Sequence, residues 1–391
     1  MTTLLIGDVW GQQPNKPLLS PPAPILPAEQ AWLRQLPSLP AASGVIDDQR
    51  VYVPLQTGGT IALMRESGEV AWKNGAGTPW PLLLAPSLVI AVNSMEIVAM
   101  DRSTGDTAWR ITLPSTAVAA GAVAGELILV PLENGAVVAL RAPDGATAWT
   151  CRLEELAPPV SLATDQTSVY LTAGNSAVAA IALASGQLLW RRMLDGMLTP
   201  PAIGKGRVFV GSTSNLFFAL DAASGRIRWN WPPQMIGGDI VGAAVDGDLT
   251  FFVGLDNLLH AVNRENGNQR WKQPTPTRPI APPAAFGGIV AVFGISPAMA
   301  TFNAKTGAAI ATYSIPNAPG ATAGSIPKGP PLIDRDLKPF GVAMAVITAD
   351  GRAIGLRPTG MLFREAPAVP LNELPGRPLP RERLAVTGST R

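Results

Sequence analysis

Short apolar runs recur through the middle of the chain, separated by polar segments and glycine-containing turns. Runs of about five residues rich in Val, Ile, Leu and Phe, such as residues 88–92, are too short for helices and are typical of buried strands. Between successive runs stand Gly58-Gly59, Asn134-Gly135 and Asp350-Gly351, residues that tolerate positive φ and close tight hairpins. The pattern predicts a series of antiparallel hairpins.

A glycine and a tryptophan recur in fixed register along these runs. Six tryptophans each follow a glycine by four residues, and successive tryptophans are 37 to 42 residues apart. The pairs are Gly68 and Trp72, Gly105 and Trp109, Gly145 and Trp149, Gly186 and Trp190, Gly225 and Trp229, and Gly267 and Trp271. Gly307 continues the series with Ala311 in place of the tryptophan, and Gly360 follows with Arg364 there. Trp32 lies 40 residues before Trp72 and is interpreted as the end of one further repeat.

Each repeat holds enough short runs for four antiparallel strands. A single four-stranded sheet buries only part of its apolar surface, whereas several sheets arranged radially bury both faces and leave only short edges. The tryptophan begins the last strand and offers a large flat surface to a neighbouring sheet. The sequence therefore predicts an all-β fold, an eight-bladed β-propeller of four-stranded antiparallel blades, with seven blades as the alternative.

The ends of the chain differ from the middle. Residues 1–43 form a proline-rich N-terminal segment, with one short helix expected at 27–36, and residues 366–391 form a proline-rich tail expected to be disordered. The propeller is expected to occupy residues 44–365. Residues 317–339, rich in proline and glycine, are expected to form a long loop before the final blade.

Composition excludes several classes of function. Hydrophobic residues make up 47% and charged residues 15% of the chain, and the net charge is +2, so nothing indicates binding to nucleic acid or to an anionic bilayer. No apolar stretch reaches the length of a membrane helix. The first ten residues lack a basic start and no cysteine lies near them, so neither a signal peptide nor a lipid anchor is predicted.

Candidate chemistry is sparse. The only cysteine, Cys151, is expected to be a half-buried residue at a strand end, and the only histidine, His260, a hydrogen-bonded strand residue. A lone imidazole cannot build a multi-histidine metal site. The close aspartate pairs, Asp246 with Asp248 and Asp334 with Asp336, are expected to be solvated turn residues rather than calcium ligands. Accordingly, no catalytic, cofactor-binding or metal residue is predicted.

Two pairs of arginines flank tryptophans at the starts of strands. Arg191 and Arg192 follow Trp190, and Arg226 and Arg228 precede Trp229. They are interpreted either as a basic rim for a protein partner or as a solvated face of the fold.

The repeat resembles the PQQ-like repeat family of β-propellers. The family pattern of apolar strand, turn, Tyr-Ala-Leu-Asp, four-residue loop and Gly-x-x-x-Trp is similar to four stretches of this chain. These stretches are Phe218-Ala-Leu-Asp221, Val98-Ala-Met-Asp101, His260-Ala-Val-Asn263 and Val138-Ala-Leu-Arg141. The resemblance covers about residues 44 to 365 and implies the propeller fold.

Within that family the resemblance extends to two functional branches. Quinoprotein alcohol dehydrogenases bind a quinone and calcium on the propeller axis beside a disulfide between adjacent cysteines, which a chain with Cys151 alone lacks. The BamB-type outer-membrane assembly lipoproteins are more similar in size, repeat number and lack of cofactor. This second resemblance implies a non-enzymatic, monomeric scaffold without cofactor, whose partners include the β-barrel assembly machinery of the cell envelope. The alternatives are a PQQ- and calcium-dependent dehydrogenase-like protein or a ligand-sensing propeller ectodomain.

Overall fold

The computed structural model describes residues 28–153, 157–232, 236–316, 325–333 and 342–359. The regular elements in these ranges are β-strands, and they form eight antiparallel sheets of four strands each. The predicted eight-bladed, all-β fold is confirmed, and the seven-bladed alternative is wrong.

Each sheet is one blade. In seven blades the strands are hydrogen-bonded in the order in which they follow one another along the chain, and in the eighth the first strand of the chain, β1, lies beside the last, β32. Blades 1 to 4 consist of β2 (Val45–Ile46), β3 (Arg50–Pro54), β4 (Thr60–Met64) and β5 (Val70–Asn74); β6 (Leu83–Leu84), β7 (Leu88–Val92), β8 (Glu96–Asp101) and β9 (Thr107–Thr112); β10 (Ala122–Ala124), β11 (Leu127–Pro131), β12 (Ala136–Arg141) and β13 (Thr147–Arg152); and β14 (Pro159–Thr164), β15 (Ser168–Ala173), β16 (Ala177–Ala182) and β17 (Leu188–Met193). Blades 5 to 8 consist of β18 (Ala202–Gly204), β19 (Arg207–Gly211), β20 (Phe217–Asp221) and β21 (Ile227–Trp231); β22 (Ile240–Asp246), β23 (Leu249–Gly254), β24 (Leu258–Asn263) and β25 (Gln269–Pro274); β26 (Ala284–Phe286), β27 (Ile289–Phe293), β28 (Ala298–Asn303) and β29 (Ala309–Ser314); and β30 (Leu332–Ile333), β31 (Met344–Ile347), β32 (Arg352–Pro358) and β1 (Ala28–Gln35).

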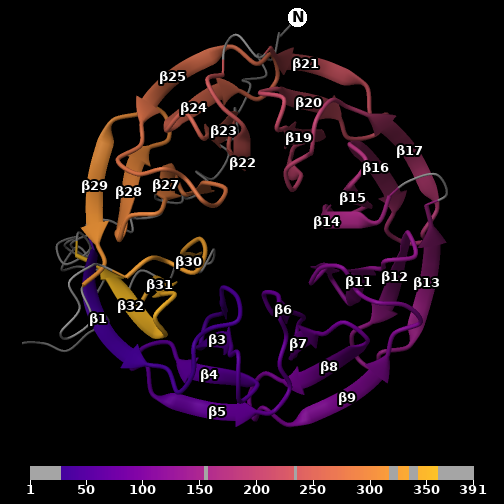
Figure 1. Ribbon diagram of the computed structural model, residues 1–391, viewed down its shortest axis with the longest axis vertical. Helices are drawn as coiled ribbons and strands as arrows, with labels where there is room; N and C mark the ends of the chain where they lie inside the picture. The colour runs from indigo at the N-terminus through magenta and orange to yellow at the C-terminus, as the bar shows by residue number, and fades with distance from the viewer. Residues whose placement is uncertain (1–27, 154–156, 233–235, 317–324, 334–341, 360–391) are drawn as a thin grey trace, which may run out of the picture.

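The blades surround a central hollow, with the first strand of each blade beside the hollow and the fourth strand on the circumference (Figure 1). Because consecutive strands are antiparallel, the turns between second and third strands lie on one face of the ring, which we call the hairpin face. The loops between third and fourth strands lie on the opposite face, the loop face. At the hairpin turns, Gly58, Gly59, Gly135 and Gly351 have φ values of 79° to 89°, as their sequence predicted.

Blade 8 closes the ring by joining the two ends of the described chain. Strand β1 pairs with β32 from Ala28 opposite Pro358 to Gln35 opposite Arg352. The predicted helix at 27–36 is therefore wrong, and so is the boundary at residue 44, because β1 belongs to the propeller. Residues 28–35 include good helix formers, but without β1 the edge of β32 would be left unpaired, and this tertiary pairing outweighs local preference.

The alanine of the repeated Ala-Leu-Asp pattern faces the tryptophan across the sheet. Ala99 is opposite Trp109, and a small residue takes the same place in the other blades that carry a tryptophan on the fourth strand. The remaining pairs are Ala62 with Trp72, Ala139 with Trp149, Ala180 with Trp190, Ala219 with Trp229, Ala261 with Trp271, and Gly355 with Trp32. A small residue at this point leaves room for the indole.

Each tryptophan also reaches into the next blade, where it covers the repeat glycine. A Cβ on Gly105 would lie 2.5 Å from Cδ2 of Trp72, and Trp72 Nε1 donates a hydrogen bond to Arg102 O, three residues before the glycine. The same contact links seven successive blade interfaces, with Trp32, Trp109, Trp149, Trp190, Trp229 and Trp271 lying against Gly68, Gly145, Gly186, Gly225, Gly267 and Gly307. The predicted packing of tryptophan between blades thus has a definite geometry, and Trp32 takes part in it.

The interface between blades 7 and 8 is built differently. Ala311 takes the tryptophan position and faces Thr301 instead of an alanine. Gly360 and Arg364, which the repeat placed at the matching position of blade 8, lie outside the described residues, as does the tail 366–391. Of the predicted loop 317–339, the described part contributes β30 and a bridge between Pro327 and Thr348.

The hydrophobic core lies between blades rather than within one of them. At the interface of blades 5 and 6, for example, the fully buried rings of Phe217 and Phe252 stack with centroids 4.2 Å apart. Cys151, which was expected to be half-buried, is 7% exposed and packs between blades 3 and 4, where burial raises the pKa of its thiol.

Candidate protein-binding rim

The four arginines singled out in the sequence lie on the circumference of neighbouring blades. Arg191 and Arg192 belong to β17 of blade 4, while Arg226 precedes β21 of blade 5 and Arg228 lies within it. All four side chains are exposed. The fold therefore gathers both pairs on one sector of the rim, spanning the outer strands of blades 4 and 5.

Two of these arginines also hold the fold together. Arg192 Nε donates to Gly225 O at 2.6 Å, which joins blade 4 to blade 5. Arg228 Nη2 lies 2.7 Å from Asp221 Oδ2, and this bond, together with that from Ser224, lowers the pKa of Asp221 to about 2.

Strand β17 exposes an unusual amount of apolar surface. Leu188 is 39% exposed, Leu189 48% and Met193 58%, and Met197, just beyond the strand, is 69% exposed. Ile227 on β21 adds a further exposed side chain at 41%. The sequence did not predict this feature, because apolar residues in a strand are expected to be buried unless the strand is known to be the outermost one.

The outer edge of β17 is also free for backbone pairing within the described chain. It is the last strand of its sheet, in the order β14, β15, β16, β17. The equivalent strands β13, with sequence TAWTCR, and β25, with QRWKQP, carry mainly polar residues at their exposed positions. Proteins commonly protect such edges with charge, so an edge that combines Leu and Met with arginine is suited to binding a partner.

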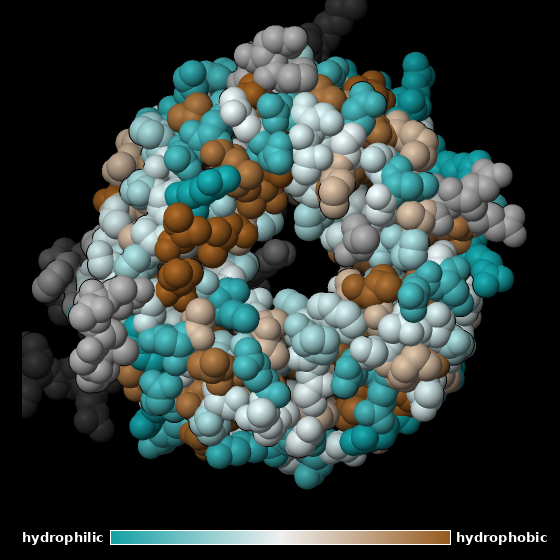
Figure 2. Space-filling model, in the orientation of Figure 1, coloured by the Kyte–Doolittle hydropathy of each residue, from teal (hydrophilic) through white to brown (hydrophobic). Residues whose placement is uncertain are grey.

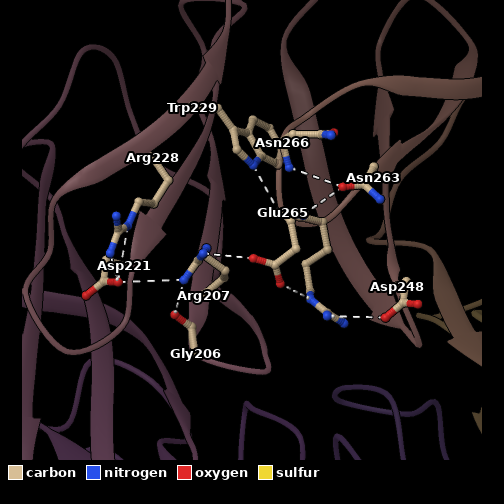
Figure 3. A network of polar contacts seen from close by, with 10 residues as sticks. Gly206, Arg207, Asp221, Arg228, Trp229, Asp248, Asn263, Glu265 and Asn266 are labelled. Atoms are coloured by element: carbon tan, nitrogen blue, oxygen red, sulfur yellow. Dashed lines mark hydrogen bonds and ion pairs between the residues drawn. The ribbon is translucent and has the colours of Figure 1, made fainter.

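A network of charged side chains continues from Asp221 across the loop face to blade 6. On the loop face, Arg207 Nη2 of blade 5 lies 2.8 Å from Glu265 Oε2 of blade 6, and Arg207 Nη1 lies 3.6 Å from Asp221 (Figure 3). Glu265 also accepts from Arg264 Nε at 3.2 Å, and Arg264 reaches Asp248 at 3.3 Å. This chain of alternating charges ties two blades together and leaves few charges for a partner there.

Of the aspartates weighed as calcium ligands, Asp246 and Asp248 take part in contacts between blades. Asp246 Oδ2 accepts from Gly288 N at 2.9 Å, and Asp248 lies 3.6 Å from Lys205 Nζ as well as near Arg264. Asp334 and Asp336 lie outside the described residues. In the described ranges no group of three or more His, Cys, Asp and Glu is placed to hold a metal ion. No helix in those ranges is long and apolar enough to cross a membrane.

His260 was expected to be hydrogen-bonded, and that expectation is wrong. It lies on β24 and is 1% exposed, yet neither ring nitrogen has a hydrogen-bond partner in the described chain. The imidazole stacks on Phe252 at 4.7 Å and meets the edge of Trp231 at 5.5 Å. Burial lowers its pKa, although Asp256, 3.9 Å from Nε2, acts in the opposite direction.

The centre of the ring carries an apolar cavity. A space of about 400 Å³ is lined by the innermost strands of blades 8, 1, 2 and 3, including Val45, Ile46, Leu83, Val123 and Leu332. Figure 2 shows the open hollow of the ring from its hairpin face. The lining residues include no charged side chain, so the cavity offers contact to apolar groups rather than to ions.

Comparison with known proteins gives one consistent family. A family model described as outer membrane protein assembly factor BamB matches residues 74–198 and 174–354. Curated proteins of that name from Moranella endobia and Yersinia pestis are each 23% identical, over 258 and 240 residues, which are 58% and 56% of this chain. The matches span 66% and 59% of those relatives, somewhat less than two thirds of their length.

Solved structures show the same architecture. The crystal structure of BamB from Moraxella catarrhalis superimposes with a TM-score of 0.63 at 17% identity, covering 84% of this chain and 99% of that one. The computationally designed Ika8 protein gives a TM-score of 0.69 at 12% identity, covering 83% of this chain and 98% of its own. At such identities the likeness establishes the fold alone.

Proposed function

The chain belongs to the BamB family of outer membrane protein assembly factors, and from that premise we propose that it is a non-enzymatic scaffold that binds a protein partner along β17. The observation that carries the proposal is the apolar edge formed by Leu188, Leu189 and Met193, whose exposed fractions are 39%, 48% and 58%. A subunit of the β-barrel assembly machinery is the partner that family membership suggests.

The chemistry of this edge favours strand addition. An unpaired edge offers backbone donors and acceptors to an extended segment of the partner, and main-chain hydrogen bonds then supply affinity. Leu189 and Met193 offer apolar contacts, and the exposed arginines Arg191 and Arg226 favour a partner with carboxylates beside its strand. We expect the apolar contacts to control dissociation and the arginines to control association and its dependence on salt.

The test is direct binding between purified proteins. The double variant Leu189→Ser/Met193→Ser is compared with the parent for binding to the purified soluble domain of the barrel-inserting subunit, and at least tenfold weaker binding is expected. Val70→Ser provides a matched control, since Val70 lies on the outer strand of blade 1 and is 52% exposed. If the double variant binds as tightly as the control, the assignment of β17 as the interface fails.

The quinone-dependent alternative has its own test. The protein is mixed with the quinone and calcium, and the absorbance spectrum and dye reduction are recorded. A stoichiometric spectral change with dye turnover would replace the scaffold proposal by an oxidoreductase.

A further inference from the structure

The circumference of the ring carries charge of almost one sign. The fourth strands of the eight blades form this circumference (Figure 1), and they contain nine lysine and arginine residues but one acidic residue, Glu29. The whole chain, by contrast, has 30 basic and 28 acidic residues. All nine cations are exposed: Arg34, Lys73, Arg110, Arg152, Arg191, Arg192, Arg228, Arg270 and Lys272. The small net charge of the chain therefore conceals a basic circumference.

Protection of the strand edges does not by itself account for these cations. Lysine is the residue that most often keeps an edge strand from pairing with another chain. Here seven of the nine cations are arginines, and only Lys73 and Lys272 are lysines. The planar guanidinium of arginine binds phosphate and carboxylate through two parallel hydrogen bonds. The composition of the circumference thus indicates recognition of anionic groups.

The cations are densest on blades 4, 5 and 6. Their outermost strands, β17, β21 and β25, follow one another along the circumference and contain no acidic residue. One further arginine directly precedes β21. We call the six cations of this stretch the basic rim; they are Arg191, Arg192, Arg226, Arg228, Arg270 and Lys272.

The fold neutralises only part of the charge of the basic rim. Arg228 Nη2 lies 2.7 Å from Asp221 Oδ2, so this cation is already paired. Among the residues that the structure describes, Arg226, Arg270 and Lys272 form no ion pair. At least three exposed cations on two adjacent blades are therefore available to an anionic partner.

Exposed apolar side chains lie among these cations. Leu189 directly precedes Trp190 and the two arginines of β17, Met193 follows them, and Ile227 stands between Arg226 and Arg228. Their exposed fractions are 48%, 58% and 41%. The surface of a bilayer offers phosphates to cations and acyl chains to apolar side chains over one continuous plane. A rim that mixes arginine with Leu, Met and Ile over three blades matches that surface.

The same stretch lacks what a nucleic acid would require. Proteins that bind single strands combine cations with exposed aromatic rings on which the bases stack. The tryptophans of the three strands are turned between the blades instead, where Trp190 and Trp271 are each 9% exposed and Trp231 is 5% exposed. The arrangement therefore favours a lipid surface over a nucleic acid.

We propose that the basic rim binds the surface of a bilayer that contains anionic phospholipids. Because the outermost strands form the wall of the ring, contact through three adjacent blades places the ring on its edge, with its axis along the bilayer plane. The proposal goes beyond the function proposed above, since it assigns a lipid surface to a stretch that extends past β17 to blade 6. A protein partner held along β17 would then lie at the bilayer.

The test is sedimentation of the full chain with vesicles. Vesicles of phosphatidylcholine alone are compared with vesicles in which about a third of the lipid is phosphatidylglycerol. We expect at least tenfold tighter binding to the anionic vesicles at low salt, and a steady loss of binding as salt is added. Arg270→Glu/Lys272→Glu should weaken binding to the anionic vesicles at least tenfold. Arg226→Gln/Arg270→Gln, which removes two charges without reversing them, should weaken it severalfold.

Arg278→Glu/Lys305→Glu is the matched control. Both residues are exposed and lie outside the outermost strands, and the double variant changes the net charge by the same amount as Arg270→Glu/Lys272→Glu. It should bind the anionic vesicles almost as the parent does. Melting temperatures of all variants are measured alongside, so that a loss of binding is compared only between folded proteins.

Three results would overturn the proposal. The first is equal affinity for neutral and anionic vesicles, and the second is an equal loss of binding in the control and the rim variants. The third is binding to a fluorescent single-stranded oligonucleotide that is tighter than binding to the anionic vesicles, which would make a nucleic acid the occupant. Arg270→Glu/Lys272→Glu lies outside β17, so it should leave binding to the barrel-inserting subunit intact. The lipid surface and the β17 interface can thus fail independently.

Discussion

The indole of Trp72 lies so close to Gly105 of the next blade that a Cβ on the glycine would stand 2.5 Å from Cδ2 of the ring. Glycine is required at this point for two reasons, since its φ of +80° also disfavours any side chain. The seven contacts of this kind explain why a repeat carries both a glycine and a tryptophan: the glycine receives the indole of the blade before it, and the tryptophan covers the glycine of the blade after it.

Gly105→Ala should therefore destabilise the protein by about 2–4 kcal/mol, by adding a steric clash to the conformational cost. Gly58→Ala separates the steric clash from the conformational cost. Gly58 has a φ of +89°, but no atom lies within 4 Å of an added Cβ. The control should lose only about 1 kcal/mol. Urea unfolding of both variants measures the difference, and equal losses would show that the tryptophan contact is unimportant.

Trp32→Ala should open the ring where its two ends meet. The variant removes packing against Gly68 and the hydrogen bond from Trp32 Nε1 to Arg65 O at 2.7 Å, with an expected cost of about 3–5 kcal/mol. Limited proteolysis should then cleave near β1 before other strands. Leu33→Ala, at a neighbouring position that is 37% exposed, should change stability by about 0.5 kcal/mol or less. Proteolysis that begins elsewhere in the Trp32 variant would argue against β1 as the closing element.

His260 should make stability dependent on pH. Because burial lowers its pKa below the ordinary value of 6.5, the unfolded chain binds the proton more readily, so native stability is complete above pH 6.5 and falls as the pH decreases below it. His260→Phe keeps the stacking on Phe252 and removes the proton site. As the pH falls from about 8 to 5, the free energy of unfolding of this variant should rise relative to that of the parent by up to about 2 kcal/mol.

Chemical unfolding at several pH values tests this expectation. The chain has no other histidine, so a difference in pH slope above pH 5 is attributable to this residue. The charges that act on it, Asp256 and Lys272, remain in both proteins. Identical slopes would mean that the buried imidazole takes up a proton as easily as an exposed one.

The Arg207–Glu265 pair should couple blades 5 and 6. Arg207 is 19% exposed and Glu265 51%, so solvent screens the attraction and a double-mutant cycle with Arg207→Gln and Glu265→Gln should give about 0.5–1 kcal/mol at low salt. The coupling should decrease as salt is added. A coupling energy of zero at low salt would mean that the network seen in Figure 3 contributes nothing to holding the blades together.

The sequence by itself determined the architecture, because the fold repeats a local chemical rule. Apolar runs of strand length, glycine turns and Gly-x-x-x-Trp specify a four-stranded unit that cannot bury its faces alone. Asp101 further shows that the loop chemistry is local, since its carboxylate accepts from Ser103 N at 2.7 Å and Thr104 N at 3.0 Å. Such information lies within a few residues of chain and can be read without a structure.

The tertiary structure alone decided which surfaces are available. Residues 28–35 favour a helix locally, yet they complete blade 8, because the edge of β32 would otherwise remain unpaired. Leu189 and Ile295 look like core residues in the sequence, and only their places on an outer strand and a hairpin expose them. The exposure of a side chain to solvent depends on contacts between segments far apart in the chain, and a local sequence pattern does not predict those contacts.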